Sequence, residues 1–134
     1  MSVPQPLRNE TKLKLLDQVM KLTAYTLNIV NNEKRFPKRY RWCCTSKIVD
    51  STYAILNYVN KANDIFVKTI EDYKLRRNYQ QIAYSECRAL LGMVDIATTS
   101  FNLTPSESWV VMIAEIKSAI KQWLDNDFKR YGTI

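Results

Sequence analysis

TPSESWVVMIAEIKSAIKQWL, residues 104–124, is the clearest indication of fold class in this chain. Thr104 is followed by Pro105 and, three residues after the threonine, by Glu107. This order is a capping box with proline at the first helical position, so it indicates a helix start. Apolar residues then recur at spacings of three and four, as on one face of an amphipathic helix: Trp109, Met112, Ile113, Ile116, Ile120, Trp123 and Leu124. We expect a helix over 105–131.

Three further helices are expected before this one, at 10–31, 38–66 and 71–100. Only two glycines and four prolines occur in 134 residues, the prolines fall at helix boundaries, and no segment alternates like a strand. Each helix has an apolar stripe. The stripes are Leu13, Leu16, Met20, Thr23, Leu27 and Val30; Arg41, Cys44, Ile48, Ser51, Ile55, Val59 and Ala62; and Arg76, Ala83, Cys87, Leu90, Val94, Ala97 and Phe101. Gly92 lies inside the third helix, where glycine costs about 1 kcal/mol relative to alanine, so we expect a neighbouring helix to approach closely there.

Four amphipathic helices with short connections predict one all-α domain over 1–134, an antiparallel up-down four-helix bundle. The composition is 46% hydrophobic, which is enough for a core. Eight tyrosines, four phenylalanines and three tryptophans exceed what the inside of one slim bundle needs. Because large apolar patches on a protein surface usually indicate interfaces, we expect a homo-oligomer.

The composition argues against an enzyme. The chain has no histidine, which is the commonest general base and metal ligand. Two glycines cannot build a phosphate-binding loop, and the 13 acidic residues are scattered. We therefore predict no catalytic residue, no metal site and no cofactor. Asp125 and Asp127, beside Lys121 and Lys129, are interpreted as part of a solvated face.

Cysteine usage and hydropathy bear on the compartment. Cys43, Cys44 and Cys87 are odd in number and include an adjacent pair, and the chain begins without a secretory signal, which together favour a reducing, cytoplasmic setting. No apolar run approaches the roughly 20 residues that span a bilayer. We expect no membrane partner.

Basic residues gather in KRFPKRYRWCCTSK, residues 34–47. The net charge is +7, and this stretch has six cations and no acid: Lys34, Arg35, Lys38, Arg39, Arg41 and Lys47. Cations at a helix start oppose the macrodipole, so the cluster is easier to explain if nucleic acid neutralises it. The alternative is that these side chains only keep the surface solvated. Phe36 and Trp42 lie among the cations, and we expect them to plug the bundle end rather than stack on bases.

A second basic group is Lys74-Leu75-Arg76-Arg77, with Arg88 further along the same helix. Arg76 and Arg77 are further candidate contacts to nucleic acid or to a polymerase, on charge alone. Arg88 lies beside the apolar stripe, where an arginine often pairs with a carboxylate at a helix or subunit interface. The candidate partners are Glu86, Asp95 and Glu115.

Three segments resemble the accessory variability determinant (Avd) proteins of diversity-generating retroelements. Phe36-Pro37-Lys38, followed by Arg41-Trp42 and by Lys47-Ile48, is similar to a segment near the start of that family's second helix. Cys87-Arg88-Ala89-Leu90-Leu91 is similar to a segment of its third helix, and Glu115-Ile116 followed by Trp123 is similar to its fourth. The likeness covers 19–123. Bundle proteins encoded by intervening sequences in 23S ribosomal RNA genes are the nearest alternative family.

The resemblance implies a bundle that assembles into a homopentameric ring with no enzymatic activity. It implies binding to the retroelement's reverse transcriptase and to RNA or an RNA–DNA hybrid, in support of mutagenic cDNA synthesis and retrohoming. By position in the motifs, it assigns such contacts to Lys38, Arg41, Lys47 and Arg88. Arg41 and Arg88 would equally suit a subunit interface, and a scaffold without a nucleic-acid role remains the alternative.

Overall fold

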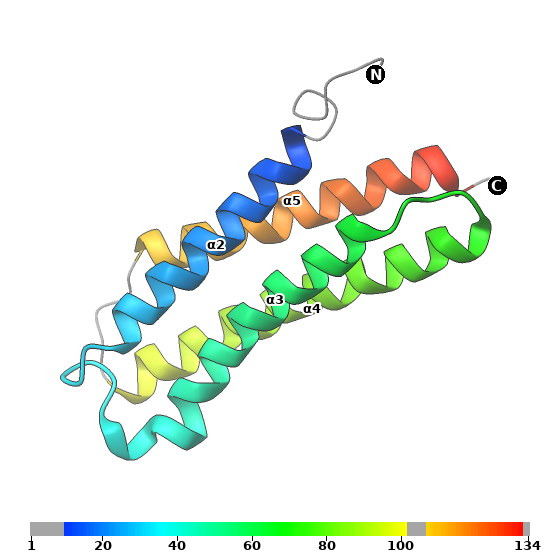
Figure 1. Ribbon diagram of the computed structural model, residues 1–134. Coiled ribbons are helices and arrows are strands. Elements are labelled where there is room, and N and C mark those ends of the chain that lie inside the picture. The colour runs from blue at the N-terminus through cyan, green and yellow to red at the C-terminus, as the bar shows by residue number, and fades with distance from the viewer. Residues whose placement is uncertain (1–9, 102–106, 133–134) are drawn as a thin grey trace.

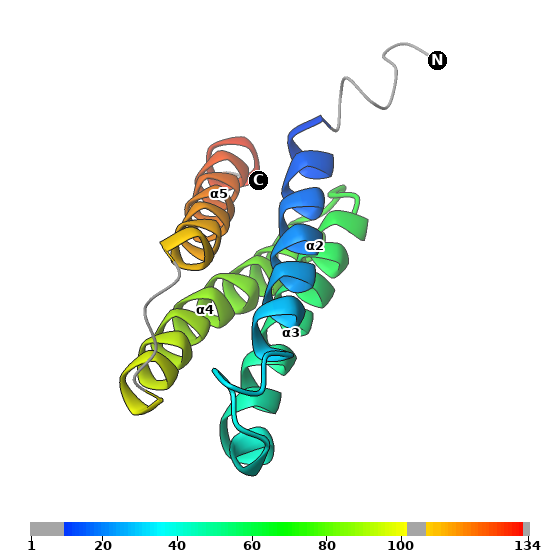
Figure 2. The ribbon, with the colours of Figure 1, turned by 90° about the vertical axis from the view of Figure 1, so that its left-hand side faces the viewer.

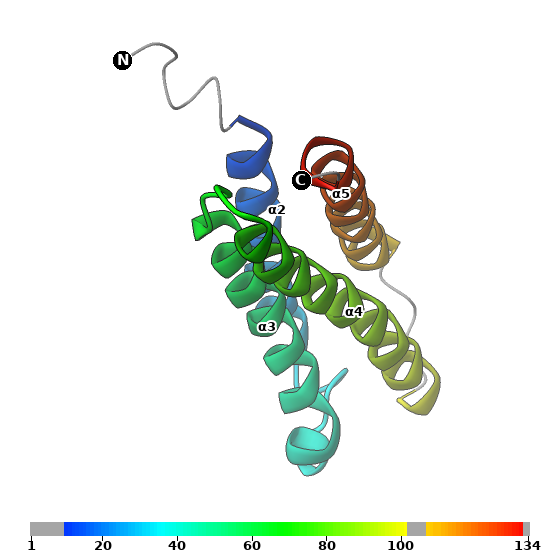
Figure 3. The same cartoon turned by 90° about the vertical axis from the view of Figure 1, so that its right-hand side faces the viewer.

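The computed structural model describes residues 10–101 and 107–132. These residues form four long helices and no strand (Figure 1): α2 (Glu10–Val30), α3 (Ser46–Asp64), α4 (Ile70–Ser100) and α5 (Glu107–Tyr131). α2 packs against α3 and α5, and α4 packs against the same two helices (Figure 2, Figure 3). The all-α class is confirmed, and the arrangement is that of a helical bundle.

We name each end of the bundle after the segment that connects two helices there. At the 31–45 end, the segment between α2 and α3 lies beside the end of α4 and the start of α5, since Phe36 contacts Phe101 and Trp109. At the 65–69 end, α3 connects to α4 beside the last turns of α5. α4 has 31 residues and so runs about 46 Å between the two ends.

α4 begins with a capping box. The backbone N–H of Asp72 donates to Thr69 Oγ1 at 3.2 Å, and the N–H of Thr69 donates to Asp72 Oδ2 at 3.1 Å. The N–H of Lys68 donates to the same carboxylate oxygen at 3.0 Å. Backbone N–H groups at the helix start, which have no acceptor within the helix, thereby gain hydrogen-bond acceptors. The observed start at Ile70 is one residue before the expected one, whereas the capping box expected at Thr104 falls outside the described residues.

The expected helix over 38–66 is wrong at both ends. A 3-10 turn (η1, Lys38–Tyr40) and a π-helical turn (η2, Arg41–Thr45) precede α3, and the chain is extended at Ile65. A π-helical turn holds more residues than an α-helical one, so it rotates the preceding residues off the stripe of α3. Arg41 is consequently exposed, although Ile48, Ser51, Ile55, Val59 and Ala62 are buried as expected.

The stripe expected on α2 is wrong in part. Met20 and Leu27 are 57% and 40% exposed, and the buried line is Leu15, Val19, Leu22, Thr23 and Thr26. Thr26 is fully buried because its Oγ1 accepts a hydrogen bond from Trp109 Nε1 at 2.9 Å. Two lines that share Thr23 run along α2, and the line that also contains Val19 and Thr26 is the one buried against the other helices.

The stripes of α4 and α5 agree with the structure. Their inward residues include Ala83, Cys87, Leu90, Val94 and Ala97 on α4, and Trp109, Ile113, Ile116, Ile120 and Leu124 on α5. The close approach expected at Gly92 is wrong among the described residues, because none of their atoms lies within 4 Å of a Cβ built there.

Candidate nucleic-acid interface

Asn32 organises the turn that carries the basic segment. Its carbonyl accepts the N–H of Arg35 at 3.1 Å and the N–H of Phe36 at 2.8 Å. Its side-chain Oδ1 accepts the N–H of Lys34 at 3.0 Å, which is an Asx-turn. The turn leaves Lys34 and Arg35 exposed and directs Phe36 into the bundle.

Phe36 closes the 31–45 end, as expected. It is 3% exposed and meets the rings of Phe101 and Trp109 edge-on, with centroids 5.6 and 6.2 Å apart. Tyr40 lies against Phe101 at 4.9 Å. Trp42, in contrast, is 80% exposed, so the prediction that it plugs the end of the bundle is wrong. The π-helical turn that contains Trp42 is the physical reason.

All six cations of the segment 34–47 are exposed at this end. Lys38 Nζ lies 3.3 Å from Glu33 Oε1, and both side chains are about two-thirds exposed. Such a surface pair contributes little and opens easily. Arg39 lies over the Tyr40 ring at 5.2 Å. No acid occurs in 34–49, so neither η1, η2 nor α3 has a carboxylate in its first turn. Glu33 is the one carboxylate that pairs with a cation of this segment in the described structure.

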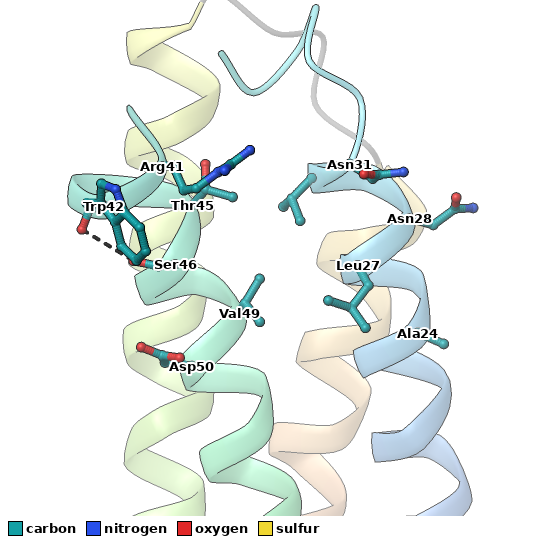
Figure 4. A pocket seen from close by; sticks show the side chains of 11 residues that line it. Ala24, Leu27, Asn28, Asn31, Arg41, Trp42, Thr45, Ser46, Val49 and Asp50 are labelled. Carbon is teal, nitrogen blue, oxygen red and sulfur yellow. Dashed lines mark hydrogen bonds between the residues drawn. The ribbon is translucent and has the colours of Figure 1, made fainter. Parts of the chain in front are cut away.

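A shallow groove of about 750 Å³ lies between the end of α2 and the start of α3 (Figure 4). Leu27 and Val49 face each other across it, and Trp42 stands at its rim with Arg41 nearby. Ser46 Oγ donates to the carbonyl of Trp42 at 3.3 Å and holds that turn. The groove therefore combines an apolar floor, an exposed indole, a cation and the exposed carboxylate of Asp50.

Arg76 does not belong to this interface, and its assignment as a nucleic-acid contact is wrong. It is 3% exposed, and its Nε and Nη2 donate to the two oxygens of Asp127 at 2.6 and 3.0 Å. Gln80 Nε2 donates to the same carboxylate at 2.8 Å, and the guanidinium lies 5.2 Å from the centre of the Trp123 ring. A guanidinium held in this way cannot contact a phosphate.

The interpretation of Asp127 as part of a solvated face is wrong for the same reason, since it is 4% exposed. Asp125 is exposed and lies 3.3 Å from Lys121, as expected of a solvated pair. The sequence contains a pattern from which the burial of Asp127 and Arg76 could have been predicted. Asp127 continues the line of Ile113, Ile116, Ile120 and Leu124 by one more step of three, and Arg76 stands on the stripe of its own helix.

The remaining candidates lie apart from the cluster. Arg88 is exposed near the middle of α4, and among the described ion pairs none joins it to Glu86, Asp95 or Glu115. Arg77 lies near the 65–69 end, half-buried, and its Nη1 donates to Tyr73 Oη at 2.9 Å. Along α4, Arg77 is about 36 Å from Phe101. The nine predicted residues thus form one cluster of six, two separate sites and one buried structural residue.

The cysteines make no metal site. In the described parts of the chain, no three residues among Cys, Asp and Glu are grouped so that they could hold a metal ion. Burial raises the pKa of Cys87 to about 12. The pKa of Cys44 is raised, first by burial and then by its neighbour Cys43, which is itself exposed.

The described helices include none that is both long and apolar enough to cross a membrane. Comparison of the chain with protein-family models, with curated proteins and with solved structures gives no match.

Proposed function

We propose that this chain is a basic, non-enzymatic accessory protein of a diversity-generating retroelement. In this proposal it works in the cytoplasm, binds the reverse transcriptase and binds RNA or an RNA–DNA hybrid, in support of mutagenic cDNA synthesis and retrohoming. The observation that carries the nucleic-acid part is the exposed cluster of six cations at the 31–45 end, without a carboxylate in 34–49. The polymerase part rests on the resemblance of three segments.

The mechanism is phosphate binding with little base specificity. Lys38, Arg39 and Arg41 occupy two consecutive short turns, one 3-10 and one π-helical, so their side chains project in several directions from one short stretch. Such a ring of cations can follow a phosphate backbone without reading a groove. Trp42 adds an exposed ring that can stack on a base at the rim of the groove.

A salt titration tests this mechanism. Each neutralised phosphate contributes about −0.7 to −0.9 to the slope of log affinity against log salt concentration. We expect the triple charge reversal Lys38→Glu, Arg39→Glu and Arg41→Glu to flatten the slope by about two to three units. Gel shifts with structured RNA at several salt concentrations measure it.

The matched control reverses three exposed lysines far from the 31–45 segment: Lys14→Glu, Lys21→Glu and Lys121→Glu. It changes the net charge by the same amount, so a local interface predicts that RNA affinity falls much less than in the cluster variant. Equal losses in the two variants would show that only the overall charge attracts RNA. Circular dichroism checks that both variants stay helical.

The up-down antiparallel order and a ring-shaped homopentamer belong to the proposal as well. The antiparallel order is supported by the short connection 65–69 between α3 and α4. The assembly is supported by the exposed apolar side chains Met20 and Leu27 on α2. The same exposed residues favour the second candidate function, an oligomerisation scaffold whose charge only aids solubility. A protein of the 23S ribosomal RNA intervening-sequence type is the third. A reverse transcriptase gene and a template repeat beside this gene would favour the retroelement accessory protein. A location inside a 23S ribosomal RNA gene would favour the intervening-sequence type.

A further inference from the structure

A connected group of aromatic and basic side chains lies at the 65–69 end, on the opposite end of the bundle from the cluster of six. We call it the Phe128 surface: Tyr73, Arg77, Phe128, Arg130 and Tyr131. The Arg77 guanidinium lies 5.7 Å from the Phe128 ring centre and donates to Tyr73 Oη at 2.9 Å. Tyr73 and Tyr131 have ring centroids 5.8 Å apart, and Arg130 lies 5.9 Å from the Tyr131 ring.

Phe128 is the unusual member, because 58% of it is exposed. It stands in the last turns of α5, three residues before Tyr131, and side chains at this spacing are neighbours on a helix surface. Phe128 contributes little to the core. Its ring is instead presented to solvent, and the Arg77 guanidinium beside it makes a cation–π contact with that ring.

The charges around this surface favour an anion. In the described segments 70–81 and 121–132, three of the four acidic side chains have partners within the chain. Asp127 pairs with Arg76, Asp125 pairs with Lys121, and Asp72 accepts hydrogen bonds at the cap of α4. Glu71 is the remaining acid of these segments, and Asp64, the exposed last residue of α3, lies at the same end of the bundle. The cations outside these two pairs are Lys74, Arg77, Lys129 and Arg130. A ligand that suits both features has a flat aromatic face and a negative charge at short distance.

We propose that the Phe128 surface binds unpaired nucleotides of a single-stranded nucleic acid. A base stacks on Phe128 beside Arg77, and Arg130 and Lys74 neutralise adjacent phosphates. A duplex does not suit the site, because its bases already stack on each other and present only their edges. The inference goes beyond the proposed function, since this surface is a second site about 36 Å along α4 from the cluster and selects unpaired nucleotides.

The test measures the affinity of a fluorescent single-stranded oligonucleotide of about eight nucleotides, within the site sizes of stacking platforms. Phe128→Leu keeps an apolar side chain but removes the flat ring, and we expect about tenfold weaker binding. Phe128→Trp keeps a stacking face, and we expect wild-type affinity or better. A duplex of the same length should bind the wild type and Phe128→Leu alike.

The matched control is Tyr53→Leu, which removes a ring that is 48% exposed on α3, away from this surface. We expect no change in affinity. The same measurements in the background of the triple reversal at Lys38, Arg39 and Arg41 separate the two sites. A Phe128→Leu effect that persists there supports this inference whether or not the cluster binds RNA.

Two results would overturn the inference. Equal affinity of wild type and Phe128→Leu would show that no base stacks there. Equal weakening by Phe128→Leu and Phe128→Trp would show that the loss of affinity does not follow the loss of a stacking face. Ultraviolet cross-linking of wild-type protein to oligouridylate, with the linked peptide identified by mass spectrometry, gives an independent readout that needs no variant. A linked peptide that contains Phe128 is the expected result, and linkage confined to other parts of the chain contradicts it.

Discussion

Arg76 and Asp127 form the most strongly buried ion pair among the described residues, and its geometry determines what it contributes. Both side chains are at most 6% exposed. Taking two charges out of water is costly, and only good geometry with further hydrogen bonds offsets that cost. Here two nitrogens of Arg76 meet both oxygens of Asp127, Gln80 adds a third bond, and Arg76 Nη1 reaches the carbonyl of Ile65 at 3.4 Å. The pair therefore fastens α5 to α4 in one register.

Removing one side chain of the Arg76–Asp127 pair should destabilise the fold far more than removing both side chains. We expect Asp127→Ala to lower the free energy of unfolding by about 3–5 kcal/mol, because Arg76 stays buried without a counter-charge. The double variant Arg76→Met with Asp127→Leu should lose less than the single variant. Urea unfolding followed by circular dichroism measures both. Asp125→Ala, which breaks the exposed pair with Lys121, is the control and should change stability by about 0.5 kcal/mol or less. A similarly small loss of stability in Asp127→Ala would contradict the conclusion that the Arg76–Asp127 pair is buried and structural.

The cysteines should differ in reactivity by burial. Cys87 is fully buried and has a pKa of about 12, so almost none of it is thiolate at pH 8. Cys43 is exposed, and its Sγ makes only a weak contact of 3.7 Å to the carbonyl of Tyr40. We expect iodoacetamide to label Cys43 in the native protein and Cys87 only after unfolding, as measured by peptide mass spectrometry. Rapid native labelling of Cys87 would mean that the core at this point opens readily.

Among the elements, α4 depends on its N-terminal cap. The carboxylate of Asp72 accepts hydrogen bonds from the backbone of Lys68 and then of Thr69, and these bonds lower its pKa below the usual 3.8. A lowered pKa in the folded state means stability that is present above pH 3.8 and is lost as the pH falls through the lower, folded-state value. The contribution is therefore complete at neutral pH.

Asp72→Asn tests this cap. We expect the variant to be less stable than wild type at pH 7, and the difference to shrink as the pH falls below about 4. Thermal melts between pH 7 and pH 3 measure it. Asp95→Asn changes an exposed carboxylate in the C-terminal part of the same helix and serves as the control. A difference between Asp72→Asn and wild type that is constant with pH would show that the carboxylate charge has no part in the cap.

Gly92 is a weak point in the interior of α4. A Cβ there would meet no atom of residues 10–101 and 107–132, and the residue is exposed, so nothing in that part of the chain requires a glycine. We expect Gly92→Ala to raise the free energy of unfolding by about 1 kcal/mol, since alanine restricts the unfolded chain and favours the helix. Chemical denaturation of dilute protein measures the effect. A loss of stability would indicate that another copy of the chain packs closely against Gly92.

On the scale of the whole molecule, α2 exposes more apolar surface than a solvated helix needs. Met20 and Leu27 face outward while Val19, Leu22 and Thr26 of the same helix are buried. A helix that is apolar on two faces is usually covered on both. This surface is the strongest structural support for an assembly of several copies.

Light scattering tests the assembly. We expect the wild type to have the mass of several chains, and the double variant Met20→Lys with Leu27→Lys to have the mass of one. Asn57→Lys, which adds a charge at an exposed polar position of α3, should leave the mass unchanged. Wild-type protein that is monomeric at high concentration would contradict the oligomeric part of the proposal.

The number of helices and most of their inward faces could be predicted from local patterns. Apolar spacing of three and four is a property of neighbouring residues, and it identified the buried lines of α3, α4 and α5. The exposure of the cations in 34–47 could be predicted as well, because so many charges in one stretch cannot all be buried.

Other features depended on the tertiary structure. Whether α2 buries Met20 or Thr26 depends on Trp109, which lies 83 residues further along the chain. Whether Arg76 faces water or a carboxylate depends on Asp127, which is 51 residues away. Trp42 is exposed because a π-helical turn precedes α3. In each case the local pattern allows two outcomes of similar free energy, and the free energy of contact with a distant residue selects one of them.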